Sequence, residues 1–131
     1  MKPLLFVLLL MVSSVSWAEW EFTQKTNDTE VIFHDKSTIR RNGAIAKMWT
    51  MVDFSKKQIS NGKPYKSQIT QFSYDCKSET IKLITSTTYS GSKGQGVSVS
   101  SYLDNDGSLP WEPVIPGSLG ETEWKIACGK K

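Results

Sequence analysis

Few residues in this chain can bind a metal or act as a nucleophile. The 131 residues include one histidine and two cysteines, so a zinc site with four protein ligands lacks donors. The HExxH, GxSxG and phosphate-loop motifs are also absent. Neither sign of charge dominates, because the formal net charge is only +3, too small for a nucleic-acid footprint. We therefore expect no enzyme, no metal, no cofactor and no nucleic-acid partner.

The one long apolar run lies at the amino terminus. Residues 4–12 are apolar, and Ser16 and Ala18 place small side chains at the two positions that signal peptidase inspects. The run is too short to span a membrane. The sequence therefore predicts a signal peptide, residues 1–18, and one exported domain without a transmembrane segment, residues 19–131.

The compartment decides how the two cysteines are interpreted. In an oxidising compartment, Cys76 and Cys128 are expected to form a disulfide. The alternatives are two buried free thiols or half of a metal site. The predicted mature chain holds 15 basic and 13 acidic residues, a net charge of +2 that implies no obligate attraction to anionic membranes.

Alternation of apolar and polar residues predicts an antiparallel sheet of about six strands. Asn42-Gly43 is a hairpin signal ahead of a central strand that carries Trp49. Asp35 is expected to cap one helical turn over residues 35–39, and residues 55–64 are expected to form a polar connection. The predicted strands are residues 19–23, 29–34, 44–54, 65–76, 80–90 and 97–103.

The last segment permits two structures. Residues 122–128 alternate as a strand would, but Ser118 followed by Glu121 forms a capping box, and Gly129 is a helix stop. We favour a helix with Trp124 on its buried face, so the predicted fold class is α+β, a single antiparallel sheet with one C-terminal helix. Trp49 and Trp124 are both expected to be mostly buried.

Two constellations suggest chemistry but have simpler explanations. His34 and Asp35 are neighbours, yet adjacent strand residues point to opposite faces and do not meet. The glycines of residues 91–96 resemble an anion-binding loop, but a strand follows them where a phosphate site needs a helix. We interpret the first pair as a strand residue and a turn cap, and the second as a hairpin loop.

The densest basic stretch is the remaining candidate for binding. It indicates either a surface for an acidic glycan or protein, or a solvated loop beside a strand edge that lysines protect. The candidate residues are Lys56, Lys57, Lys63, Tyr65 and Lys66.

The order of these features resembles the bacterial surface-adhesin protein E family. The similar parts, which extend over nearly the whole predicted mature chain, are Trp20-Glu21-Phe22, residues 31–39, Met48-Trp49, residues 72–76, Tyr89-Ser90-Gly91 with Gly94-Gln95-Gly96, and Pro116-Gly117-Ser118 ahead of Cys128.

The resemblance implies a C-terminal helix held against the sheet by a disulfide, and binding in place of catalysis. Its named member is an adhesin for host matrix proteins, and the stretch around Lys63, Tyr65 and Lys66 lies about where an adhesive surface would be sought. Lipid-anchored relatives carry a cysteine at the cleavage site, whereas this chain has Ala18-Glu19. We therefore expect an unlipidated protein of the periplasm or cell surface that binds a protein or acidic glycan; the alternative is a periplasmic accessory factor for an envelope partner. The sequence leaves the oligomeric state open.

Overall fold

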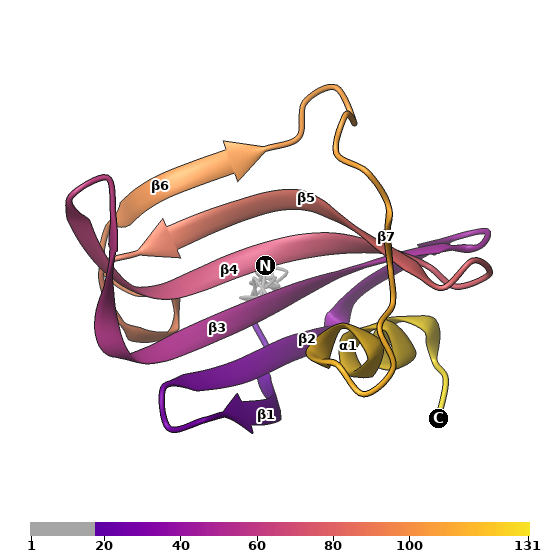
Figure 1. Ribbon diagram of the computed structural model, residues 1–131, viewed down its shortest axis with the longest axis horizontal. Coiled ribbons are helices and arrows are strands. Elements are labelled where there is room, and N and C mark those ends of the chain that lie inside the picture. Colours follow the sequence, from indigo (N-terminus) through magenta and orange to yellow (C-terminus); the bar gives the residue numbers. More distant parts are fainter. Residues whose placement is uncertain (1–17) are drawn as a thin grey trace, which may run out of the picture.

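The computed structural model describes residues 18–131, so the predicted signal peptide lies outside the described residues except for Ala18. The chain forms one curved antiparallel sheet in which the first six strands lie in sequence order and the seventh pairs with the fifth (Figure 1). The strands are β1 (Glu21–Thr26), β2 (Glu30–Asn42), β3 (Ile45–Ser60), β4 (Lys63–Asp75), β5 (Thr80–Tyr89), β6 (Ser98–Leu103) and β7 (Glu112–Pro113). A short 3-10 turn, η1 (Ser92–Gly94), precedes β6, and the helix α1 (Leu119–Cys128) ends the fold.

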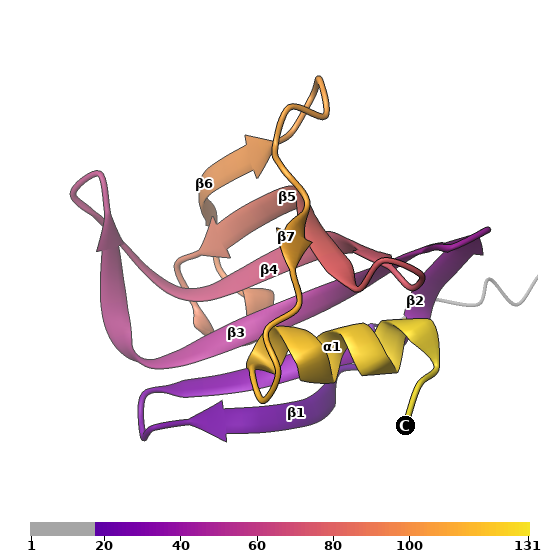
Figure 2. The ribbon, with the colours of Figure 1, turned by 45° about the vertical axis from the view of Figure 1, so that its right-hand side comes forward.

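The helix α1 lies across one face of the sheet (Figure 2). Ser118 caps it by accepting a hydrogen bond from the backbone N–H of Glu121, and Gly129 ends it in the left-handed conformation with φ of 67°. The predicted helix and the predicted α+β fold class are therefore confirmed. The disulfide between Cys76 and Cys128 joins the end of β4 to the end of the helix.

The main core lies between α1 and the strands β3 and β4. The Trp124 indole N–H donates to the backbone oxygen of Asp75 over 2.8 Å, which fixes the buried ring in place. The buried members of this core are Ala46, Met48, Tyr74, Trp124, Ala127 and Cys128.

Trp49 lies on a central strand, as expected, but it does not belong to this core. It pairs with Gln71, one position away from the core pair of Met48 and Phe72. Since adjacent strand residues point to opposite faces, Trp49 lies on the face away from α1, where it is half-buried.

The two central strands are longer than expected, and the prediction of a polar connection at residues 55–64 is wrong. Those residues extend β3 and begin β4 in a hairpin that turns at Asn61-Gly62. Figure 1 shows this hairpin projecting from the end of the sheet opposite the C-terminus. The strand residues of this hairpin are mostly polar because the hairpin projects into solvent and does not pack against the core.

The expected helical turn at residues 35–39 is also wrong. The strand β2 continues to Asn42, with its register to β3 shifted between Asp35 and Arg40. The carboxylate of Asp35 accepts hydrogen bonds from the backbone N–H and hydroxyl of Ser37. This is the local turn bonding expected of an aspartate, but it forms a bulge within a strand.

Candidate functional site

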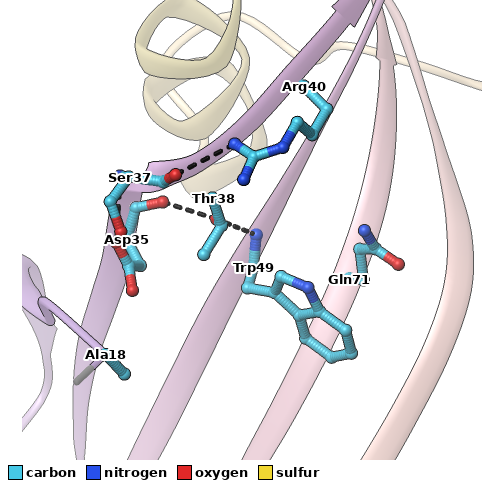
Figure 3. A pocket seen from close by; sticks show the side chains of 7 residues that line it. All are labelled: Ala18, Asp35, Ser37, Thr38, Arg40, Trp49 and Gln71. Carbon is cyan, nitrogen blue, oxygen red and sulfur yellow. Dashed lines mark hydrogen bonds between the residues drawn. The ribbon is translucent and has the colours of Figure 1, made fainter. Parts of the chain in front are cut away.

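A pocket lies beside this bulge, on the sheet face opposite α1 (Figure 3). We call it the outer-face pocket. Its volume is about 400 Å³. It is lined by Ala18, Asp35, Ser37, Thr38, Arg40, Trp49 and Gln71.

Hydrogen bonds hold the walls of the outer-face pocket. The Arg40 guanidinium donates to the backbone oxygens of Ser37 and Ile39, each over 3.0 Å. The Thr38 hydroxyl accepts from the backbone N–H of Trp49 at 3.0 Å, which joins the bulge to β3. The pocket therefore offers a ligand an indole face, an amide and a fixed guanidinium.

His34 and Asp35 lie at the same point of β2 but have separate partners. His34 Nδ1 lies 2.6 Å from the Thr23 hydroxyl, and its Nε2 lies 3.2 Å from the carboxylate of Glu21. Burial lowers the pKa of His34, and the Glu21 carboxylate opposes that shift. Asp35 points into the outer-face pocket, so the structure does not bring the two side chains together as an acid–base pair.

The glycine-rich residues 91–96 connect β5 to β6 and fold back over the sheet. Gly94 has φ of +75°, and a Cβ at this position would lie 2.6 Å from the Ile69 side chain. The Lys93 ammonium lies 5.6 Å from the Phe33 ring centre on the same face. Their close packing against the sheet gives these residues a structural role as a loop that covers the face opposite α1.

The basic residues lie on the projecting hairpin, residues 55–66, which we call the distal hairpin. Lys56, Lys57 and Lys63 are exposed, whereas Lys66 is half-buried. Strand alternation places Lys63 and Lys66 on opposite faces of the hairpin, whereas Lys56 and Lys57 lie where the register of β3 against β4 shifts. The structure therefore groups the four lysines on one segment but separates Lys63 from Lys66.

Tyr65 is less exposed to a binding partner than its position among the lysines suggests. Its ring packs edge-on against Phe54, with the ring centres 5.7 Å apart, and the residue is half-buried. The exposed apolar side chains near the hairpin are Ile59 and Val97, with 66% and 69% of their surfaces accessible. A groove of about 320 Å³ between the hairpin and the start of β6 is lined by Lys63, Pro64, Ser90, Val97, Ser98 and Val99.

Sequence reasoning missed the outer-face pocket and the groove. Both depend on residues that are distant in sequence, such as Asp35 with Gln71 and Pro64 with Val97. A tryptophan on the face opposite the apolar Met48 is the one signal that could have pointed to the pocket. Within residues 18–131, no group of three or more His, Cys, Asp and Glu side chains could hold a metal ion, and no helix is long and apolar enough to cross a membrane.

A disulfide-linked helix on an antiparallel meander, with a lysine-bearing hairpin at one end, defines a small α+β domain. The chain belongs to the surface-adhesin protein E family, whose model matches residues 20–129. No curated protein matches this chain in sequence.

Crystal structures of Haemophilus influenzae protein E have the same fold. Crystal form II is 13% identical, with a TM-score of 0.60 over 75% of this chain and 80% of that one. Protein E from non-typeable Haemophilus influenzae is also 13% identical, with a TM-score of 0.59 over 82% of this chain and 75% of that one. At such low identity the likeness concerns the fold alone.

Proposed function

We propose that this chain is an exported, non-catalytic binding protein whose distal hairpin contacts an acidic partner, a host matrix protein or an acidic glycan. The observation that carries the proposal is that the four hairpin lysines form no ion pairs within the described residues. None of the ion pairs among residues 18–131 involves Lys56, Lys57, Lys63 or Lys66. Their charges are therefore not neutralised by contacts within the described domain.

Apolar surface beside these charges supports a contact with a macromolecule. Ile59 and Pro64 face each other across the hairpin, and strand alternation puts Lys66 on the same face as Pro64. Exposed lysines mainly increase the rate and selectivity of encounter, whereas desolvated apolar groups supply most of the affinity. A partner that covers Ile59 and the neighbouring groove would use both contributions.

The chemistry of the described residues supports binding over catalysis. Hydrogen bonds from Ser37 and Glu19 occupy both carboxylate oxygens of Asp35. The two cysteines are joined in the disulfide and leave no free thiolate as a nucleophile. The outer-face pocket therefore lacks a free general base next to a nucleophile.

The test is binding of the purified protein to immobilised heparin and to matrix proteins at low and high salt. We expect binding to weaken as salt rises from about 0.1 M to 1 M, because the screening length falls from about 10 Å to about 3 Å. The double variant Lys63→Glu/Lys66→Glu changes one lysine on each face and should bind at least about tenfold more weakly. Lys130→Glu/Lys131→Glu is the matched control, because it changes the net charge equally at the exposed C-terminus.

Equal losses from the two double variants would show a general charge effect and refute the hairpin site. If the protein binds but neither salt nor charge reversal weakens the binding, the hairpin lysines do not contact the partner and only protect a solvated strand edge. If the protein binds no matrix protein or heparin, and protease added to intact cells does not reach it, the accessory role in the envelope replaces adhesion.

A further inference from the structure

The backbone nitrogen of Glu19 has an unusual partner for a residue next to a predicted cleavage site. Its N–H donates to Asp35 Oδ2 over 2.9 Å. Asp35 is 1% exposed, whereas Glu19 is exposed, so the hydrogen bond lies at the surface edge of a buried carboxylate. The contact places the start of the predicted mature chain against a buried carboxylate.

Asp35 has no cationic partner in the described part of the chain. Its other carboxylate oxygen accepts from the backbone N–H and hydroxyl of Ser37, which are neutral donors. No ion pair among residues 18–131 includes Asp35. Arg40 lines the same pocket, but its guanidinium donates to backbone oxygens. An ionised carboxylate that is buried without a countercharge destabilises a fold by several kcal/mol.

Cleavage after Ala18 would supply the missing charge. The peptide nitrogen of Glu19 would become the α-amino group of the mature chain, which is a cation at neutral pH. We infer that removal of the leader converts the Glu19–Asp35 hydrogen bond into a partly buried ion pair that secures the amino-terminal strand. This inference rests on the expected cleavage site and is independent of the proposed ligand.

The position of this contact explains why it would affect the fold. Glu19 lies two residues before β1, which forms an edge of the sheet and pairs only with β2. Asp35 belongs to β2, so the ion pair would fasten the free end of the edge strand to its neighbour. Ala18 lines the outer-face pocket and would leave it on cleavage, which opens that side of the pocket.

The other charged groups near Asp35 have partners of their own, so the α-amino group would be the cation that faces Asp35. In the pocket, β2 contributes Arg40, whereas Trp49 of β3 and Gln71 of β4 are uncharged. On β1, the carboxylate of Glu21 contacts His34 and Lys36.

The experiment uses the full chain with its own leader, exported and purified, with intact mass giving the first residue. The test variant carries Ser-Gly inserted between Ala18 and Glu19, so that the new α-amino group lies two residues before Glu19 and no longer faces Asp35. We expect the insertion to lower the thermal midpoint by about 4 °C or more at pH 7. In an Asp35→Asn background, the insertion should change the midpoint by less than about 1 °C, since the countercharge is absent.

A second measurement on the natural sequence remains decisive if Asp35→Asn fails to fold. The pKa of the Glu19 α-amino group, followed by NMR, should lie at least about one unit above its ordinary value of about 7.7–8.0. A raised pKa means that the stabilisation is complete below pH 7.7 and is lost as pH rises through the folded value. An ordinary pKa, an insertion effect that persists without Asp35, or a purified chain that begins elsewhere than Glu19 would each overturn the inference.

Discussion

The hydroxyl of Tyr74 lies 3.5 Å from Oε2 of Glu123 in the buried interface between β4 and α1. Tyr74 is fully buried and Glu123 is 6% exposed, so the helix presents a carboxyl group to the apolar core. Burial raises the pKa of Glu123 to about 7, and the hydrogen bond from Tyr74 opposes this shift. Burial and the neighbouring Glu123 also raise the pKa of Tyr74. The helix therefore docks best when Glu123 carries a proton.

This relationship predicts that Glu123 makes the fold less stable as pH rises. Between pH 4.5 and about 7 the folded chain holds a proton on Glu123 that the unfolded chain has lost. The free energy of unfolding should therefore fall by about 3 kcal/mol across this range and level off above it. The measurement is urea unfolding of the natural chain and of Glu123→Gln at several pH values.

The difference between the two curves isolates Glu123, because His34 acts in the opposite sense. The lowered pKa of His34 makes folding more favourable as pH rises through about 6.5. Glu112→Gln is the control, since it removes the same charge from an exposed site and should leave the pH dependence unchanged. A Glu123→Gln curve parallel to that of the natural chain would contradict the prediction.

The disulfide should supply a large share of the stability. It closes a segment with a sequence separation of 52, and loss of such a bond costs about 2–5 kcal/mol. We expect this loss for Cys128→Ser in urea unfolding, and for the natural chain when a reductant is added. The double variant Cys76→Ser/Cys128→Ser should not respond to reductant. A loss below about 1 kcal/mol would show that packing alone holds the helix.

The two tryptophans should differ strongly in their contribution to stability. Trp124 fills the core and donates to the backbone of Asp75, so Trp124→Ala should cost about 3–5 kcal/mol. Trp49 is half-buried beside the outer-face pocket, and Trp49→Ala should cost about 1–2 kcal/mol. Chemical unfolding of the two variants gives both values. Similar losses would mean that the two sheet faces are equally important to folding.

Gly94 and Gly62 form a matched pair of glycines, because both have φ of +75°. Replacement by alanine imposes similar backbone strain at each site. At Gly94 the added Cβ would lie 2.6 Å from the Ile69 side chain, whereas at Gly62 nothing lies within 4 Å. We expect Gly94→Ala to cost about 1–3 kcal/mol more than Gly62→Ala, the usual effect of overpacking. Equal unfolding free energies would show that residues 91–96 pack loosely on the sheet.

Local signals in the sequence were sufficient for the elements with strong end markers. Ser118, Glu121 and Gly129 predicted both ends of α1, and Asn42-Gly43 predicted the turn between β2 and β3. The strands of the distal hairpin were missed because their polar residues do not alternate with apolar ones, although Asn61-Gly62 was correctly interpreted as a turn. The strand pairing at these residues depends on the register of β3 against β4, which composition does not encode.

The candidate sites were harder to predict, because each depends on contacts across the sheet. The sequence predicted three of the lysines on a connection and Lys66 at the start of a strand, but only the register of β3 against β4 shows that Lys63 and Lys66 lie on opposite faces. The outer-face pocket depends on the register shift between Asp35 and Arg40. The residue types in this stretch do not indicate that the strand continues through it. A bulge in place of a helical turn changed the role of Asp35 from a cap to the wall of a pocket.

The bond between Cys76 and Cys128 also divides the chain topologically. Every residue of β5, β6 and α1 lies within one covalently closed ring, whereas β1 to β4 form a linear tail attached to it. The exposed residues 105–108 belong to the ring. A protease that cuts there opens the ring without releasing a fragment, and the nicked molecule keeps its mass, apart from one added water, until the sulfurs are reduced. The ring thus makes this loop a place where the backbone can be broken while the helix stays attached to the sheet.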